Sequence, residues 1–267
     1  MIYEQLTHHI SEPDVPITIE KKERHIFITW ERPPLNVLDI ALLNELDQAL
    51  SKCADDSGTD ILVLKGAGTR AFSAGVDIRD HTKEKVPEML EAAHGVVRKL
   101  LGIPQVTVAA VRGACLGGGC EIASSCDLIV ATEESSFATP EIRVGCYPPV
   151  ALARFSQVIG YHRAAEMILT GRSFSAGEAY AMGLINRVCA AEQFDPELQR
   201  LLEDLSRQSG AVLRVAVKGL RTLSLKGFEQ ALQYSEELYC RELLQTSDVE
   251  EGIAAFLQKR PPIWNHR

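Results

Sequence analysis

The amino-acid sequence predicts an α/β fold in which a layered core is followed by a helical C-terminal part. Over the first two-thirds of the chain, short apolar runs typical of buried strands alternate with amphipathic helical patterns. After Tyr161 the helical spacing of apolar residues continues almost throughout. The chain has 267 residues, 46% of them hydrophobic, which is enough to bury a core without disulfides or a structural metal. We expect a core over residues 1–198 and a helical subdomain over residues 199–267.

Strands and helices are expected to alternate in the core. Apolar runs rich in β-branched residues predict strands at 25–30, 60–65, 106–111 and 127–132. Leucines at helical spacing predict a helix over residues 39–52, where Asp39 is suited to cap the first turn. A second amphipathic pattern covers residues 86–101. A short helix is expected to open at the three glycines that follow position 116 and to run up to Cys126.

The C-terminal third is expected to be helical. Apolar residues there recur every three to four positions, which is the spacing of one helix face. The helices are predicted at residues 163–169, 175–182, 196–209, 211–225 and 228–257.

Charge and cysteine content narrow the class of protein. The net charge of −8 argues against nucleic acid as a partner, because such binding depends on Lys and Arg that neutralise phosphates. The seven cysteines form no CxxC pair, so we read them as reduced thiols of a cytoplasmic protein. No HExxH motif or close His/Cys cluster occurs, so no metal site is predicted, and His81 and His94 are interpreted as surface or structural residues.

The chain shows no targeting or membrane segment. Its first residues, MIYEQLTHHISEPD, lack the basic and apolar segments of a signal peptide. No stretch reaches the about 18 apolar residues of a membrane-spanning helix. We therefore expect no membrane partner.

The stretch CLGGGCEIASSCD, residues 115–127, places Gly117, Gly118 and Gly119 directly before Cys120 and Glu121. A helix that starts at Gly118 leaves its first N–H groups without intrahelical partners, and glycine lets a ligand oxygen approach them closely. This arrangement is suited to one half of an oxyanion hole, with Glu121 one turn into the same helix. The alternative is that the glycines serve close helix–strand packing.

Two further stretches carry candidate chemistry. Glu141 follows a proline in an expected loop between apolar neighbours, where a carboxyl group often has a raised pKa suited to acid–base work. The alternative is an ordinary surface acid. In AFSAGVD, residues 71–77, Gly75 permits a tight turn that directs the N–H of Val76 towards a ligand.

Together these stretches resemble the enoyl-CoA hydratase (crotonase) superfamily. The matching segments follow one another in the family's order and spacing: RPPLN at 32–36, AFSAGVDI at 71–78, AVRGACLGGGCEIASSCD at 110–127, PEIRVG at 140–145 and LTGRSFSAGEAYAMGLINRV at 169–188. The resemblance covers nearly the whole chain. It implies a spiral of repeated ββα turns and a C-terminal helical part through which the chain forms a homotrimer or a dimer of trimers.

The resemblance also implies the site residues. The backbone N–H groups of Val76 and Gly118 correspond to the oxyanion-hole donors, and Glu121 and Glu141 to the catalytic carboxylates of true hydratases. Many relatives with isomerase, hydrolase or decarboxylase activity lack one of the two carboxylates, so the pair implies water addition to a 2-enoyl thioester, with Glu121 assigned to the water and Glu141 to the carbon proton. Coenzyme A, as part of the substrate, is the implied ligand, and no metal or redox cofactor is expected. The residues expected to contact it or the acyl group are Leu35, Ala74, Val76, Gly117, Tyr147 and Pro149.

One segment departs from the ordinary hydratases. After PEI these read like GTIPGAGGTQRL, whereas this chain reads GCYPPVALARF over residues 145–155, so that Tyr147, Pro148, Pro149 and Val150 are expected to make the acyl pocket wall bulkier and stiffer. This variant resembles the dienoyl-CoA hydratases of anaerobic benzoyl-CoA degradation, which hydrate cyclohexa-1,5-diene-1-carbonyl-CoA to the 6-hydroxycyclohexene product. A straight-chain or branched enoyl-CoA hydratase is the alternative.

Three other readings are weaker. LKGAGTRA contains GxGxxA after a strand, but no clear helix opens there, which argues against dinucleotide binding. GRSFS has Ser175 where a nucleophile elbow requires glycine. A catalytically silent member that binds RNA or a partner protein is disfavoured by the net charge and by the paired glutamates.

Overall fold

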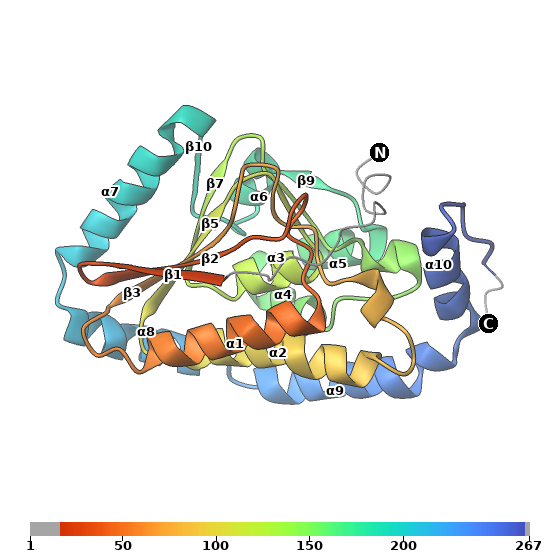
Figure 1. Cartoon of the computed structure of the whole chain (residues 1–267). Helices are drawn as coiled ribbons and strands as arrows, with labels where there is room; N and C mark the ends of the chain where they lie inside the picture. The colour runs from red at the N-terminus through yellow and green to blue at the C-terminus, as the bar shows by residue number, and fades with distance from the viewer. Residues whose placement is uncertain (1–16, 265–267) are drawn as a thin grey trace.

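The computed structural model describes residues 17–264, and the expectations about the first 16 residues lie outside that range. Two sheets form the centre of the fold (Figure 1). The larger sheet has the strand order β1-β2-β3-β5-β7-β10, in which β1 is antiparallel to β2 and the other pairs are parallel. Its strands are β1 (Ile17–Lys22), β2 (His25–Trp30), β3 (Ile61–Gly66), β5 (Val106–Val111), β7 (Leu128–Thr132) and β10 (Arg187–Cys189).

The smaller sheet has the order β4-β6-β8-β9, with β9 antiparallel to β8. Its strands are β4 (Ala71–Ser73), β6 (Ala114–Leu116), β8 (Ser136–Ala138) and β9 (Phe174–Ser175). The chain repeatedly places one strand in the larger sheet, the next in the smaller sheet, and then a helix or helical turn. This confirms the spiral of ββα turns that the family resemblance implied.

Helices cover both faces of the larger sheet. In Figure 1, α1 (Ile40–Ala54), α2 (Val86–Gly102) and α9 (Phe228–Arg241) lie below the sheets, and α7 (Phe194–Ser206) lies at the upper left. The remaining helical elements are η2 (Ile78–Asp80), α3 (Gly118–Ser124), η3 (Pro140–Val144), α4 (Pro149–Ile159), α5 (Tyr161–Thr170), α6 (Ala176–Ala181), η4 (Ala191–Gln193), α8 (Gly210–Ser224), η5 (Leu243–Gln245) and α10 (Ser247–Leu257).

The apolar pattern of the sequence divides into three buried clusters. The largest lies between the sheets, α1 and α2, and includes Trp30 and Phe72. The second packs α7 and α8 against the strands β3 and β5. The third joins α2, α9 and α10 around Tyr239, and Val76 packs against it. The third cluster borders the loop that carries Val76, a predicted oxyanion donor.

The predicted strands and most predicted helices agree with the structure to within a few residues. The cap at Asp39 is present, because its side chain accepts a hydrogen bond of 2.9 Å from the N–H of Leu42. The short strands β4, β6, β8, β9 and β10 were not predicted, because two or three residues are too few to show a period of two. The strand β1 and the helix α4 were also missed.

One predicted helix, residues 228–257, is wrong: the structure has α9, η5 and α10 in its place. The chain leaves the helical conformation at Thr246, whose ψ is 140°. This turn lets α10 pack against η3 so closely that a Cβ on Gly252 would stand 2.4 Å from the carbonyl oxygen of Val144. Packing on a distant segment therefore overrides a locally continuous helical pattern.

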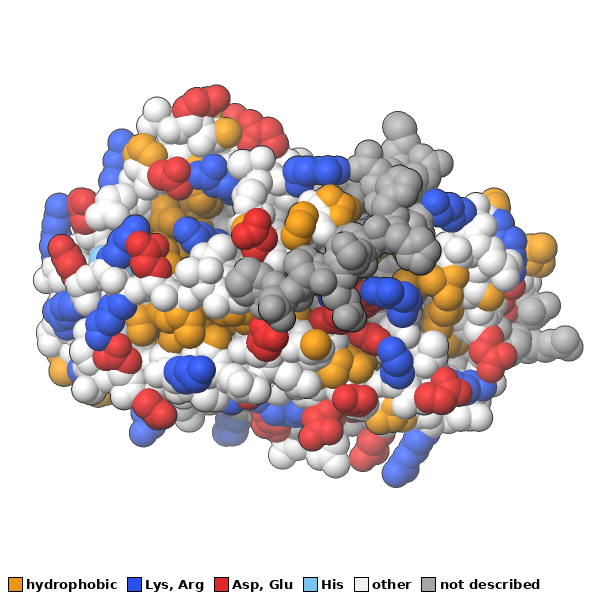
Figure 2. Space-filling model, in the orientation of Figure 1, with side chains coloured by type: hydrophobic (Ala, Val, Ile, Leu, Met, Phe, Trp, Pro, Cys, Tyr) orange, Lys and Arg blue, Asp and Glu red, His pale blue; other side chains and the backbone are white. Residues whose placement is uncertain are grey.

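The boundary predicted after residue 198 falls within α7 and stays a prediction. Within residues 17–264, no helix is long and apolar enough to span a membrane. On the face shown in Figure 2, basic and acidic side chains are interspersed and no continuous basic area is visible.

Candidate active site

Each of the three glycines before Glu121 is required by a different neighbour. A Cβ on Gly117 would stand 2.9 Å from Oε1 of Glu141, and the φ of Gly117 is +53°. A Cβ on Gly118 would stand 2.7 Å from Cγ2 of Val76, and one on Gly119 would stand 2.6 Å from Cβ of Ser73. Gly119 therefore packs closely against Ser73, whereas Gly117 and Gly118 lie beside Glu141 and Val76 of the candidate site, whose oxyanion role stays a prediction.

The N–H groups of Val76 and Gly118 lie beside each other. A Cβ on Gly118 would stand 3.7 Å from the nitrogen of Val76, and one on Gly75 would stand 3.7 Å from the nitrogen of Gly118. Among residues 17–264, neither N–H donates a hydrogen bond. The N–H of Gly118 is one of the first in α3, where the helix leaves donors free. Two adjacent free donors form the arrangement required for an oxyanion hole.

The loop around Val76 is held by backbone bonds to the segment before α1. The N–H of Leu38 donates to Gly75 O at 2.9 Å, and the N–H of Asp77 donates to Leu38 O at 2.9 Å. The N–H of Ala74 donates to Leu35 O at 3.0 Å. Because its neighbours on both sides are bonded in this way, Val76 is presented with its own N–H free.

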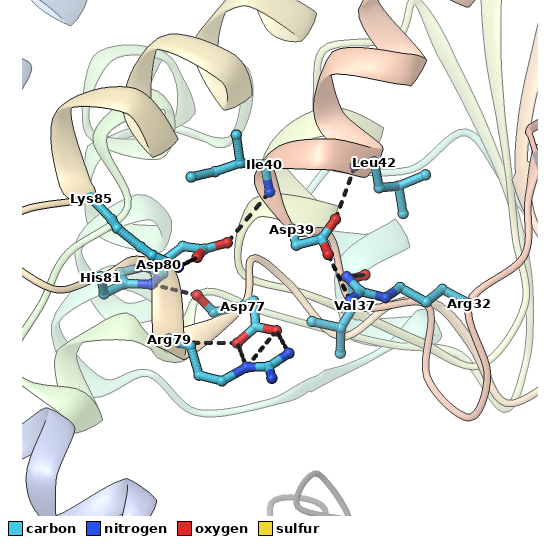
Figure 3. Close-up of polar contacts among 10 residues, drawn as sticks. All are labelled: Arg32, Val37, Asp39, Ile40, Leu42, Asp77, Arg79, Asp80, His81 and Lys85. Carbon is cyan, nitrogen blue, oxygen red and sulfur yellow. Dashed lines mark hydrogen bonds and ion pairs between the residues drawn. The ribbon is translucent and has the colours of Figure 1, made fainter. Parts of the chain in front are cut away.

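Side chains brace the same loop against the start of α1 (Figure 3). Asp39, the N-cap of α1, pairs with Arg32 at 2.6 Å. Asp80, four residues after Val76, accepts from the N–H of Ile40 at 3.4 Å and pairs with Lys85 at 2.9 Å. Both carboxylates lie at the N-terminus of α1, where the helix dipole favours negative charge. The segments around Leu35 and Val76, which are predicted to contact coenzyme A, are thereby held at the N-terminus of α1.

Figure 3 also shows the contacts of Asp77, the residue next to Val76 in the chain. Asp77 pairs with Arg79 at 2.6 Å, and its carbonyl oxygen lies 3.1 Å from Nδ1 of His81. His81 is half-buried, and burial lowers its pKa. These contacts fit the structural reading of His81.

Glu121 is buried and anchored to the N-terminus of α4. Its Oε1 accepts a hydrogen bond of 2.9 Å from the N–H of Ala151, and the N–H of Val150 also interacts with the carboxyl group. Burial raises the pKa of Glu121, while the nearby His94 and the two backbone donors partly counteract that rise. Glu121 is therefore the better stabilised of the two predicted catalytic carboxylates.

Glu141 has fewer partners. It lies in η3, its Oε1 faces Gly117, and its buried Oε2 has no hydrogen-bond partner among the described residues. Burial, and then repulsion by Glu121, raise the pKa of Glu141 well above its usual range. The two glutamates are thus close enough to interact, and of the two it is Glu141 whose pKa is raised by repulsion from its partner.

The other residues predicted to contact the substrate are Leu35, Ala74, Pro149 and Tyr147. Leu35 and Ala74 are joined by their backbone bond beside Val76. Pro149 is the first residue of α4, the helix whose amides hold Glu121. Tyr147, predicted to contact substrate, donates its hydroxyl proton to Ser235 O of α9 at 2.7 Å. Its polar end is therefore occupied within the protein.

Sequence reasoning missed residues of α2 and α9 that lie behind the site. His94 is 2% exposed, and its Nδ1 lies 2.6 Å from Oε1 of Glu236. Tyr239 is 1% exposed and belongs to the apolar cluster against which Val76 packs. No motif marks either residue, because each is brought to the site by packing of α2 and α9.

No cluster of three or more His, Cys, Asp or Glu suited to hold a metal ion occurs within residues 17–264. The expectation that no metal or redox cofactor takes part stays a prediction.

The comparisons with known proteins agree with this geometry. The family model for enoyl-CoA hydratase/isomerase matches residues 20–267. The chain belongs to this family. It is 32% identical over 260 residues to a cyclohexa-1,5-dienecarbonyl-CoA hydratase of Thauera aromatica, covering 97% of this chain and 100% of the relative. It is 33% identical over 254 residues to a probable enoyl-CoA hydratase of Mycobacterium bovis, covering 94% of this chain and 98% of the relative.

Solved structures of the enoyl-CoA hydratase/isomerase family share the fold. An enoyl-CoA hydratase from Mycobacterium avium subsp. paratuberculosis superimposes with a TM-score of 0.85 at 26% identity, over 93% of this chain and 98% of that chain. A methylmalonyl-CoA decarboxylase superimposes with a TM-score of 0.82 at 24% identity, over 94% of this chain and 98% of that chain. The prediction of a hydratase-type enzyme is confirmed at the level of the family, whereas the fold alone is shared by a decarboxylase.

Proposed function

We propose that this enzyme is an acyl-CoA hydro-lyase that adds water to cyclohexa-1,5-diene-1-carbonyl-CoA and forms the 6-hydroxycyclohex-1-ene product. The observation that carries the reaction type is the pair of buried carboxyl groups, Glu121 and Glu141, next to two free backbone N–H groups. The named relative from Thauera aromatica supports the acyl group. The bulky segment 147–150 further supports a cyclic acyl group in place of a linear one.

In this proposal the N–H groups of Val76 and Gly118 bind the thioester carbonyl oxygen. Negative charge develops on that oxygen when water attacks the conjugated carbon. Two fixed donors stabilise the charge without reorganising, and loss of one such donor typically costs about 2.7–4 kcal/mol. The backbone of Leu35 and Ala74 is proposed to hold coenzyme A, and Gly117 and Pro149 to border the acyl group.

The two glutamates are proposed to divide the proton transfers. Glu121, whose carboxylate is stabilised by the α4 amides, removes a proton from the attacking water. Glu141, whose pKa is raised by burial and by repulsion from Glu121, donates a proton to carbon. The difference in environment between the two carboxyl groups supports this assignment, since a general base and a general acid need opposite protonation states at the same pH.

A straight-chain or branched 2-enoyl-CoA hydratase is the second candidate. It is favoured by the 33% identity to the probable enoyl-CoA hydratase of Mycobacterium bovis. The catalytic proposal is the same for both candidates, and only the acyl group differs.

The test is to incubate the purified protein separately with cyclohexa-1,5-diene-1-carbonyl-CoA and with crotonyl-CoA, and to measure the mass of one added water. Hydration of the cyclic ester alone supports the first candidate, and hydration of crotonyl-CoA alone supports the second. Glu121→Gln and Glu141→Gln should abolish turnover, while the matched surface change Glu134→Gln should not. If neither ester gains water, the hydratase proposal is wrong and a non-catalytic binding role gains support.

We further propose that the protein is cytoplasmic and that it forms a homotrimer or a dimer of trimers. The helix α8 supports self-association, because Val212, Val215, Leu220 and Leu223 are 66–79% exposed in the single chain. Light scattering coupled to size exclusion tests this proposal. Leu220→Glu together with Leu223→Glu should reduce the mass to that of one chain, about 29.4 kDa.

A further inference from the structure

Some buried side-chain oxygens of η3 and α9 lack hydrogen-bond partners among the described residues. Within residues 17–264, five buried side-chain oxygens have no hydrogen-bond partner, and three of them belong to η3 and α9. These three are Oε2 of Glu141, Oγ of Ser235 and the hydroxyl of Tyr239. Native proteins satisfy nearly all of their buried polar groups, so these exceptions, one of them on a predicted catalytic carboxyl group, require an explanation.

Tyr239 is fixed in position by its neighbours. Its ring meets the ring of Tyr147 edge to face, with centroids 5.2 Å apart and an interplanar angle of 70°. Tyr147 is in turn anchored by the 2.7 Å hydrogen bond from its hydroxyl to Ser235 O. Because Tyr239 is 1% exposed, its hydroxyl has no route to bulk solvent.

Cys146 lies beside both Tyr239 and Glu141. Its N–H donates to Glu141 O at 3.0 Å, and its thiol interacts with the hydroxyl of Tyr239. Burial raises the pKa of Tyr239, and the nearby groups of Cys146 and Glu141 raise it further. Both effects favour the protonated phenol, which can donate a hydrogen bond.

We infer that Tyr239 is a positioning residue for Glu141: its hydroxyl donates, through one bound water, to Oε2 of the Glu141 carboxyl group. The inference rests on the proposed function of Glu141 as a proton donor. A bridging water requires two or more polar partners, and Tyr239 and Glu141 supply them, with Oγ of Ser235 one helical turn away. With Oε2 occupied as an acceptor, the proton of the neutral acid resides on Oε1, the oxygen that faces Gly117.

The pKa of Glu141 depends on the titratable groups around its carboxyl group. Glu121 of α3 is the charged side chain that raises its pKa, and Cys146 and Tyr239 are the thiol and phenol beside it. The helices α5 and α10 also contact η3, but in the described structure none of their charged side chains is among the causes of the shift. Loss of the Tyr239 donor should therefore raise the pKa of Glu141, because a donor to a carboxyl oxygen favours the ionised form.

The experiment compares Tyr239→Phe with Tyr234→Phe on whichever thioester the native enzyme hydrates. We expect Tyr239→Phe to lower kcat by roughly tenfold or more, to leave KM within about twofold, and to move the alkaline limb of the kcat/KM profile to higher pH. Tyr234→Phe is the matched control on the same helix: its side chain is 64% exposed, so it should leave both kcat and the pH profile unchanged. An unchanged kcat and pH profile in Tyr239→Phe would overturn the inference, as would the same change in both variants.

A second measurement requires no substrate and separates this inference from the proposed function. Infrared difference spectra assign the C=O band of protonated Glu141 by its absence in Glu141→Gln. In Tyr239→Phe we expect the band to move to higher frequency, because Oε2 loses its donor. A band that stays in place overturns the inference even if the native enzyme hydrates both esters, and a band that moves supports it even if the enzyme hydrates neither.

Discussion

The carboxylate of Glu121 accepts a 2.9 Å hydrogen bond from the N–H of Ala151 at the start of α4. Pro149 occupies the first position of that helix, where its missing N–H costs nothing, and the following amides remain available to the carboxylate. Glu141 has no comparable support, since its Oε2 is buried without a partner among the described residues. One helix terminus thus makes two carboxyl groups of the same type differ in their affinity for a proton.

The first prediction concerns Gly117. We expect Gly117→Ala to lower kcat/KM by at least about 100-fold, because its Cβ would stand 2.9 Å from Oε1 of Glu141 and displace the proposed proton donor. Steady-state kinetics on the hydrated thioester measures this. Gly160→Ala is the control: its φ is +79° and a Cβ there meets nothing within 4 Å, so it carries backbone strain without a clash in the site. A similar loss of activity in both variants would show that backbone strain, and not the contact with Glu141, is responsible.

The second prediction concerns the contact between Gly118 and Val76. Gly118→Ala should reduce kcat/KM, because its Cβ would stand 2.7 Å from Cγ2 of Val76 and push the two donors apart. Val76→Ala removes that methyl group, so the double variant should recover most of the activity. The quantity to measure is the coupling energy of the double-mutant cycle, which we expect to exceed about 1 kcal/mol. Simple additivity of the two effects would contradict the proposed geometry.

The third prediction concerns pH. The usual pKa of glutamate, about 4.3, applies to Glu141 in the unfolded chain, and the pKa is raised in the native state. Above about pH 4.3 the unfolded chain has therefore released a proton that the native protein still holds. Stability of the native protein should therefore fall as pH rises from that value through the raised pKa. Glu141→Gln does not titrate, so it should melt at least about 2 °C above the native protein at pH 8 and at the same temperature at pH 4. Melting curves across this range test the sign, and an equal difference at both pH values would contradict it.

The fourth prediction concerns the attachment of the C-terminal helices. Arg221 of α8 is 7% exposed, pairs with Asp127 at the start of β7, and donates to Ile103 O at 2.5 Å and Gln105 O at 3.0 Å. Arg221→Met leaves the partner carboxylate and carbonyls short of donors, so we expect a loss of about 3–5 kcal/mol in the free energy of unfolding. Chemical denaturation measures it. The exposed pair of Arg200 with Glu197 provides the control, because Arg200→Met should cost less than about 1 kcal/mol.

The sequence alone was sufficient for the parts of the fold whose signals are local. The strands β2, β3, β5 and β7 and the helices α1 and α2 each contain enough residues to show their period, and Asp39 marks a helix start by its own side chain. Glu121 and Glu141 could be identified from the sequence as catalytic candidates for a different reason. They lie in glycine- and proline-containing segments that match the motifs of the family.

The features that the sequence could not provide depend on contacts between distant segments. The break at Thr246 results from the packing of α10 on η3, and the turning of Tyr147 towards Ser235 results from the position of α9. Tyr239 is 98 positions from Glu141, and no local pattern connects them. Local periodicity indicated the α/β class, and the resemblance of the motifs to the family implied the ββα order and the two carboxyl groups. Only the tertiary structure decided which of them is stabilised by a helix terminus and which is left with a buried, unpaired oxygen, because desolvation and hydrogen bonding are properties of the packed chain.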